Sequence, residues 1–219
     1  MTRLEIRTLS RKRLGETTEA FWSNSELNTW LNVACKDVAY RTKCLKANGL
    51  LTTTEDTSEY ALSTNFDDIV SILEVEYYQD GTTWKKIPST TREELNDVQP
   101  GWKSADSATP TTYYSDREED VIGFYPPPNG DNDGAYARLY YTYEHSDISD
   151  DNNSPTLPVP ILHLAVVDWI VATGFETRGY QDKANDVWQK YYTKLRDYKV
   201  ERNREKEDDE IIMKSDYNL

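Results

Sequence analysis

The sequence has few of the residues that build most chemical sites. It contains two cysteines, two histidines and two methionines among 219 residues. No His-x-x-x-His or Cys-x-x-Cys pair occurs, so the common spacings of zinc ligands are missing. A glycine-rich phosphate-binding motif and a Gly-x-Ser-x-Gly elbow are also missing. We therefore expect no metal and no cofactor, and we predict that the chain is not an enzyme.

The two cysteines do not predict a disulfide. Cys35 and Cys44 are nine residues apart on one predicted helix. Nine helical steps place them on opposite faces, about 13 Å apart along the axis, so they cannot pair there. Nothing nearby predicts the electropositive, exposed setting of a reactive thiolate. We expect two ordinary small helix residues in a protein kept in a reducing compartment.

Long apolar runs are missing as well. No stretch is long enough to cross a bilayer, and the N-terminus lacks the apolar core of a signal peptide, so we expect no membrane association. Hydrophobic residues make up 37% of the chain and charged residues 29%. A core is still expected, because 16 Tyr and 6 Trp bring large apolar surfaces with polar edges. These two residue types are also favoured at interfaces.

Positive charge is scarce in the middle of the chain. Residues 55–160 hold 22 acidic and 6 basic residues, whereas the rest holds 17 acidic and 19 basic residues. Such a block repels phosphate, so we do not expect it to grip DNA. An acidic wall can serve a DNA conduit by preventing adhesion. The alternative is a solvated surface that keeps the protein soluble.

Two acidic clusters are candidates for a bound cation. One contains Asp131 and Asp133, and the other contains Asp147, Asp150 and Asp151. Neither has the ligand spacing and terminal Glu of an EF-hand loop. Solvated turns explain both clusters without a cation.

Helical periodicity dominates the start of the chain. Apolar residues at three- and four-residue steps predict a long helix over 19–48, with Ser25 as its N-cap and Asn48-Gly49 as its stop. The basic residues of 1–13 form an arm too short to fold alone. That arm could bind an acidic partner or nucleic acid, or remain a flexible terminus.

A helical hairpin is predicted near the end of the chain, over 158–206. Its first helix starts at the prolines near 160 and is apolar nearly all round over 161–172, so it is buried in this chain or in an oligomer. His163 on this helix is expected to be a core or interface histidine. The second helix runs from about 181 to 205, with Trp188 as a buried member of its apolar stripe.

The middle of the chain has the period of strands. Strands are expected near 59–63, 72–78, 84–87, 111–114, 121–125 and 135–143, with a short helix over 89–98 capped by Thr90 and Glu93. Asp80-Gly81 between two of these runs predicts a hairpin. Residues 145–157 read as a polar linker. We expect five or six antiparallel strands in a small sandwich or a curled sheet.

Together these patterns predict an α+β fold. A helical bundle, made of the long N-terminal helix and the C-terminal helical hairpin, carries an inserted antiparallel β-rich block. The expected parts are the arm and first helix (1–57), the acidic β-rich insertion (58–156), the hairpin that completes the helical body (157–206) and a C-terminal docking tail (207–219). The tail is apolar after a charged spacer, which favours a docking peptide over a frayed end.

The layout resembles that of tailed-bacteriophage head–tail adaptor (connector, or head completion) proteins. The resemblance lies in three stretches: 21–34; 121–128 with 136–141; and Asp150-Asp151 followed by 157–160 and the helices at 162–172 and 188–192. It implies a non-enzymatic structural virion protein, made in the host cytoplasm. This protein would form a homo-oligomeric ring, commonly of twelve copies, beneath the portal at the head–tail junction.

The resemblance also implies partners. These are the portal protein, tail or nozzle proteins, and DNA that passes without specific binding through an exit channel that the ring lines or surrounds. The C-terminal segment would dock on the portal through Ile211, Ile212, Met213, Tyr217 and Leu219.

Two other functions fit the same sequence. One is a non-catalytic, tail-associated module that binds a receptor or a carbohydrate through aromatic strands. The other is a hydrolase with a dispersed site, using a carboxylate or His145. An adaptor should need its terminal helices to assemble, whereas a lectin-like module should be separable and bind as a monomer or trimer.

Overall fold

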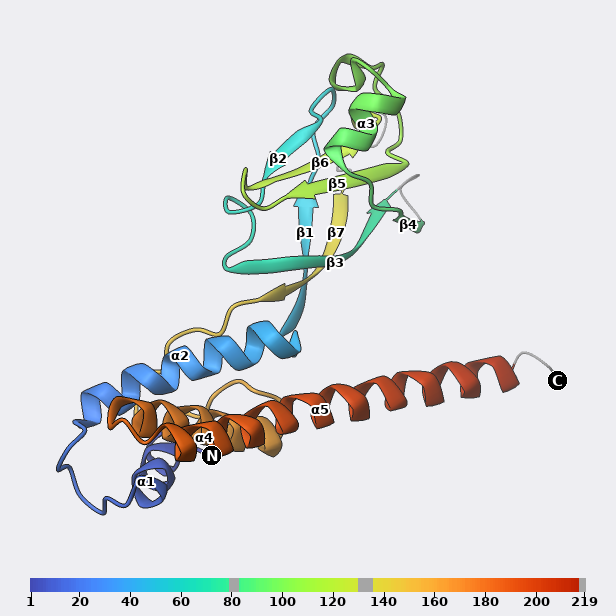
Figure 1. Ribbon diagram of the computed structural model, residues 1–219. Helices are drawn as coiled ribbons and strands as arrows, with labels where there is room; N and C mark the ends of the chain where they lie inside the picture. Colours follow the sequence, from blue (N-terminus) through green and yellow to red (C-terminus); the bar gives the residue numbers. More distant parts are fainter. Residues whose placement is uncertain (79–82, 130–135, 217–219) are drawn as a thin grey trace. The chain divides into compact units, whose positions relative to one another are not determined.

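The computed structural model describes the chain except residues 79–82, 130–135 and 217–219, and residues 205–216 by their backbone alone (Figure 1). The described residues form five α-helices, one short 3-10 helix and seven strands in two antiparallel sheets. The prediction of a mixed α+β fold is confirmed. Two compact units are present: a helical unit, Met1–Leu45 with His145–Leu219, and a β unit, Lys46–Glu144.

Four helices build the helical unit: α1 (Arg3–Leu14), α2 (Asn24–Thr42), α4 (Pro160–Thr177) and α5 (Gln181–Asp216). Helix α4 packs against the other three. Most of its apolar side chains are buried, namely Leu162, Ala165, Val166, Val167, Ile170, Val171 and Ala172, and the others, among them Leu164 and Trp169, are half-buried. The most apolar helix is therefore covered by its own chain, and an oligomer is not needed to bury it.

The prediction that the N-terminal residues form an arm too short to fold is wrong, because residues 3–14 form helix α1. A capping box of Thr2 and Glu5 starts this helix, and Gly15, with a φ of 81°, ends it. Its arginines are not free to bind an outside partner, since carboxylates of the same unit hold them, as described below.

Helix α2 begins at Asn24, within the predicted range of 19–48 but two residues before the start that the predicted cap implied. Its N-cap is Ser23 rather than Ser25. The Ser23 hydroxyl oxygen accepts from the Glu26 N–H at 3.1 Å, and the Glu26 carboxylate accepts from the Ser23 N–H. The sequence contains this capping box, Ser-x-x-Glu, and its serine lies two residues before Ser25, on which the prediction relied.

The end of α2 also differs from the prediction. The helix stops at Thr42, and Lys43 adopts a left-handed conformation with a φ of 51°. Arg202 of α5 donates to the carbonyl oxygens of Thr42 and Lys43, each at 3.2 Å. The helix was predicted to reach residue 48, but Lys46–Thr52 is strand β1 instead. Cys44 therefore lies after the helix and not on it.

Helix α5 is longer than predicted, since it continues to Asp216. The part after Arg202 is about 21 Å long at 1.5 Å per residue, and it extends beyond the other helices of its unit (Figure 1). The predicted stripe is confirmed at Ala184, Tyr191, Leu195 and Tyr198, which are buried. Trp188 is only half-buried, so its predicted burial is wrong.

The β unit contains two sheets. The first has the order β1-β7-β3-β4 and the second β2-β6-β5. Their strands are β1 (Lys46–Thr52), β2 (Glu59–Ala61), β3 (Ile69–Tyr78), β4 (Trp84–Ile87), β5 (Thr112–Asp116), β6 (Val121–Tyr125) and β7 (Tyr136–Tyr143). All six predicted strands are present, and β1 was missed. Strands β3 and β4 pair antiparallel, as the hairpin signal predicts, while the Asp80-Gly81 turn lies outside the described residues.

One apolar core joins the two sheets of the β unit, as in a sandwich. Its buried side chains come from both: Leu51, Val75, Tyr77, Ile87, Ala137 and Leu139 from the first sheet, and Tyr113, Ile122 and Phe124 from the second. Alternate residues of β3 and β7 point inward, because successive side chains of a strand face opposite sides. Val75 pairs with Leu139 and Tyr77 with Ala137 in that register.

A smaller cluster covers the second sheet. Helix α3 (Arg92–Val98) and the 3-10 helix η1 (Trp102–Ser104) place Leu95 and Trp102 against Tyr114 of β5. The cap of α3 is Thr91, one residue after the predicted Thr90. Gly123 lies opposite Tyr114 in the register, and a Cβ at that position would overlap the tyrosine ring. A glycine is therefore needed where the ring crosses the neighbouring strand.

Candidate interaction surfaces

The arginines of α1 are bound by acidic residues of the same unit. Asp151 accepts from Arg3 Nε at 2.7 Å and from the two terminal nitrogens of Arg7 at 2.9 and 2.7 Å. Arg7 also donates to Asn28 Oδ1 on α2, and Arg3 to the carbonyl oxygen of Ile148. The guanidinium of Arg7, followed by that of Arg3, lowers the pKa of Asp151. The predicted polar linker is thus tied into the helical unit, and Asp151 is an ion-pair partner rather than a cation ligand.

A second ion-pair network centres on Asp168 of α4, whose side chain is 2% exposed. Arg13 Nη1 of α1 lies 2.5 Å from its Oδ1, and Lys194 Nζ of α5 donates to its Oδ2. One buried carboxylate therefore joins three helices. Sequence reasoning missed it, although an aspartate inside an apolar helical run is itself a signal, because buried acids need partners.

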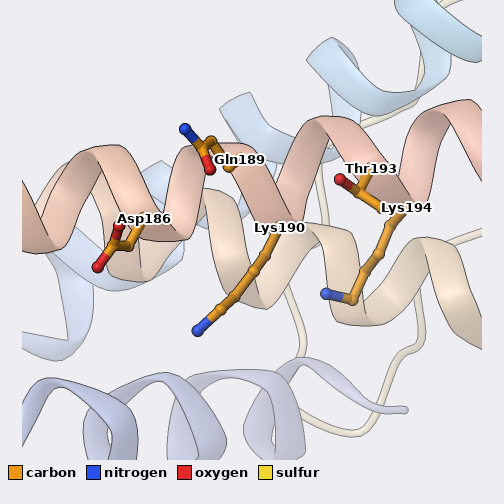
Figure 2. A pocket seen from close by; sticks show the side chains of 5 residues that line it. All are labelled: Asp186, Gln189, Lys190, Thr193 and Lys194. Carbon is orange, nitrogen blue, oxygen red and sulfur yellow. The ribbon is translucent and has the colours of Figure 1, made fainter.

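Lys194 also lines a shallow hollow along α5 (Figure 2). The other lining residues are Asp186, Gln189, Lys190 and Thr193. Figure 2 shows Lys190 and Lys194 extending to the same side of the helix. All five residues come from one helix, and they bring together two amines, one carboxylate and no nucleophile with a base. The hollow therefore has the chemistry of a contact surface rather than of a catalytic pocket.

The loop between α1 and α2 is fastened to the turn between α4 and α5. Arg178 Nη2 donates to Glu16 Oε1 at 2.8 Å, and its guanidinium lies 4.0 Å from the centre of the Trp22 ring and 4.5 Å from that of Phe21. The buried guanidinium of Arg11 donates to the carbonyl oxygen of Trp22 at 2.9 Å. These contacts connect the two segments at this end of the helical unit.

Helices α2 and α5 run parallel and meet along a polar seam. The Tyr191 hydroxyl donates to Asp37 Oδ2 at 2.5 Å, and Arg41 lies over the ring of Tyr192 at 5.7 Å. Burial, followed by the hydrogen bond to Asp37, raises the pKa of Tyr191, so its hydroxyl remains protonated and donates. Asp37 and Arg41 on α2 contact Tyr191 and Tyr192 on α5, in the same order along both chains, so the two helices run parallel.

The histidines are engaged in structural hydrogen bonds. His145 is 3% exposed; its Nδ1 lies 2.6 Å from the Ser146 carbonyl oxygen, and its Nε2 accepts from the Thr156 N–H at 3.1 Å. His163 is buried, as expected, with Nε2 3.1 Å from the Leu157 carbonyl oxygen. Burial lowers the pKa of both rings. The hydrolase hypothesis named a carboxylate or His145, and the His145 ring has no free nitrogen.

The cysteines are likewise unsuited to nucleophilic chemistry. Burial raises the pKa of the Cys35 thiol to about 12, and it raises that of Cys44. A thiol is a nucleophile only as the thiolate. Both thiols are free of disulfide bonds, as predicted.

The remaining acidic candidates are occupied or lie outside the described residues. Asp147 Oδ1 is 3.2 Å from Lys36 Nζ, and Asp150 Oδ1 accepts from the Asn152 N–H. Asp131 and Asp133 fall in the undescribed segment 130–135. Across the described ranges, no group of three or more His, Cys, Asp or Glu side chains is arranged to hold a metal.

The residues predicted to dock on the portal belong to the C-terminal segment 207–219. The side chains of Ile211, Ile212 and Met213 lie outside the described residues, as do Tyr217 and Leu219 entirely. Among the helices that the structure describes, none combines the length and the apolar character that a bilayer requires.

Comparison with known proteins completes these observations. The model of the SU10 adaptor protein family matches residues 1–210. The match therefore includes the helical unit, the β unit and most of α5. No curated protein sequence matches the chain.

Proposed function

Because the chain belongs to the SU10 adaptor protein family, we propose that it is a non-enzymatic structural protein that forms a ring adaptor between a phage portal and the tail. The ring lines or surrounds the DNA exit channel at the head–tail junction, and its copies are made in the host cytoplasm. The observation that carries this proposal is the family match over residues 1–210. The engaged histidines and the buried Cys35 thiol agree with a structural role.

The two units suggest a division of labour. The helical unit, with its closely packed α4, is suited to be the rigid body of the ring. The β unit holds 19 acidic and 7 basic residues, so its surface repels phosphate. It would therefore let DNA pass without holding it, and it would meet tail or nozzle proteins.

The projecting end of α5 is the proposed portal contact. About 21 Å of helix extends past Arg202, and an isolated helix of that length is marginal in water. A partner that accepts it would stabilise it. The residues proposed to dock are Ile211, Ile212, Met213, Tyr217 and Leu219, which follow the charged stretch of the tail.

The test is to mix the purified full chain with the portal from the same genome and to follow the mixture by sedimentation and negative-stain imaging. The expected result is a portal that gains a second ring of density and sediments faster. A portal of unchanged size, beside chain that remains monomeric, would contradict the proposal.

A tail-associated binding module is the second candidate, and one observation favours it. The outer face of the first sheet carries aromatic rings: Tyr78 lies 5.0 Å from Trp84, and Arg138 lies 4.0 Å from the Trp84 ring. Aromatic faces of this kind also bind sugars and proteins. Glycan binding by the full chain that Trp84→Ala abolishes, with portal binding absent from both proteins, would favour this function over the adaptor.

A further inference from the structure

The loop end of the helical unit exposes aromatic rings that are held in place. We call it the end surface, made of Phe21, Phe175 and Tyr180. Phe21 is 58% exposed, yet its N–H donates to Glu16 Oε1 at 2.9 Å and Arg178 covers its ring. Such fixed, exposed aromatic side chains are typical of interface anchors, because little conformational entropy is lost when they are buried.

Tyr180 completes this surface. It is 51% exposed, and its N–H donates to the Phe175 carbonyl oxygen at 2.9 Å. Its ring lies edge-on to that of Phe175, and the Lys183 amine lies over both rings. Arg178, which lies between Phe175 and Tyr180 in the chain, contacts the Phe21 ring, so the α1–α2 loop and the end of α4 present one aromatic surface.

A second aromatic surface lies along the seam of α2 and α5. We call it the flank surface, made of Val33, Tyr40 and Tyr192, each close to half exposed or more; Tyr40 is 63% exposed. Val33 and Tyr40 are two helical turns apart, so they share one face of α2. That face also carries Asp37 and Arg41, which contact α5 through Tyr191 and Tyr192.

The charges around the two surfaces are opposite. The exposed charges of segments 16–23 and 175–183 at the end surface are three acids, Glu19, Glu176 and Asp182, and one base, Lys183, while Glu16 is buried and paired with Arg11 and Arg178. Exposed bases accompany the flank surface: Arg41 and Lys43 at the end of α2, and Arg196 and Lys199 four and seven residues after Tyr192 on α5. Asp37 and Asp197 pair with Arg41 and Arg196, so Lys43 and Lys199 leave this surface positive. Opposite charge on two apolar surfaces favours their contact and disfavours contact of either surface with itself.

We propose that these two surfaces bind one another between copies of this chain, the end surface of one copy against the flank surface of the next. The inference rests on the proposed function, because it assigns the contact that builds the ring. Two different patches on one rigid unit make a heterologous interface, and such an interface closes into a ring when the rotation between copies permits.

The experiment uses two double variants of the full chain. The end variant carries Phe21→Ser and Tyr180→Ser, and the flank variant carries Val33→Ser and Tyr40→Ser. Leu4→Ser is the matched control, since Leu4 is an exposed apolar residue of α1 outside both surfaces. Circular dichroism and thermal unfolding verify that each protein is folded, and sedimentation with and without portal measures assembly.

We expect the Leu4 control to assemble as the wild type does and each double variant to need at least about tenfold more protein for the same assembly, which corresponds to 1.4 kcal/mol. An equimolar mixture of the two variants retains one intact pair of surfaces. It should therefore form dimers and nothing larger, a result that only a heterologous interface gives.

Two results would overturn the inference. Rings from either double variant at wild-type concentrations would show that the named surfaces do not form the contact, and the adaptor function would stand. A mixture that remains monomeric would show that the two surfaces do not bind each other. If the wild-type chain remains monomeric when it is mixed with portal, the proposed function is refuted, and this inference with it.

Discussion

Arg7 of α1 donates two hydrogen bonds to Asp151, 144 residues later in the chain, at 2.9 and 2.7 Å. Arg3 also donates to Asp151, and Arg7 donates in addition to Asn28 Oδ1 on α2. The contact ties the start of the helical unit to the segment that leads into α4. The basic N-terminus and the acidic linker thus bind each other, although each one alone has the sequence of a solvated tail or loop.

Asp151→Ala should destabilise the helical unit by about 1–3 kcal/mol, because two guanidinium groups lose their acceptor while the site keeps some contact with water. Urea denaturation followed by circular dichroism measures this loss. Asp150→Ala is the matched control, since its carboxylate accepts only from the nearby Asn152 N–H among its described contacts. Equal losses from both substitutions would contradict the assignment.

Asp168→Asn should be more costly, at about 3–5 kcal/mol, because it leaves the charges of Arg13 and Lys194 without a partner at a buried position. Asp186→Asn on the exposed side of α5 should change stability by no more than about 0.5 kcal/mol. The free energy of unfolding in urea compares the two. A loss below about 1 kcal/mol for Asp168→Asn would mean that this carboxylate does not join the three helices.

Tyr191→Ala should destabilise the protein more than Trp188→Ala. Tyr191 is fully buried and donates to Asp37, so about 3–5 kcal/mol is expected. Trp188 is half-buried, with its Nε1 bonded to the exposed Glu176, and about 1–2 kcal/mol is expected. Thermal unfolding of the two variants gives the order. A larger loss of stability for Trp188→Ala would contradict this order and would support the burial of Trp188 that helical periodicity predicted.

Stability should fall as the pH drops below about 6.5. Burial lowers the folded-state pKa of His145 and His163 from the ordinary value of 6.5. Below pH 6.5 the unfolded chain therefore binds more protons at these two rings than the folded chain does. The contribution of the two neutral rings to the free energy of unfolding is complete above pH 6.5, and it is lost as the pH falls toward their folded-state pKa values. Asp151, with its lowered pKa, adds a further loss below its ordinary value of 3.8.

The measurement is the melting temperature at pH 7.5 and pH 5.5 for the wild type and for a His145→Gln, His163→Gln double variant. The wild type should lose more on acidification than the double variant does. Equal losses would assign the acid sensitivity to other groups.

Local patterns predicted much of the fold. Strand-forming residues next to turn signals located β4 and β6 at their observed bounds, and the proline-initiated, all-apolar run located α4. These elements were predictable because their signals, strand formers beside turn residues and a proline before an apolar run, lie in adjacent residues.

Long-range contacts decided the rest. Residues 46–52 follow α2 with no breaker before Asn48-Gly49, and only their pairing with β7 makes them a strand. Arg202, 160 residues away, bonds the end of α2. Helix α1 likewise depends on carboxylates far along the chain. No local signal reports such partners, and the end and flank surfaces, which combine distant segments, were missed for the same reason.

Deleting residues 207–219 should leave the fold intact and weaken attachment to the portal. The deletion removes the last part of α5, which extends past the other helices of its unit. The melting temperature should therefore change by only a few degrees, whereas portal binding should need at least about tenfold more protein. Normal portal attachment by the truncated chain would show that the docking segment lies elsewhere.

The most direct test of the account is the mass of the purified portal after incubation with an excess of the full chain and removal of unbound protein. Native mass spectrometry or mass photometry provides it. The adaptor function predicts a single heavier species that contains a fixed whole number of added copies, and the resemblance implies twelve. A portal of unchanged mass at saturating protein would contradict it.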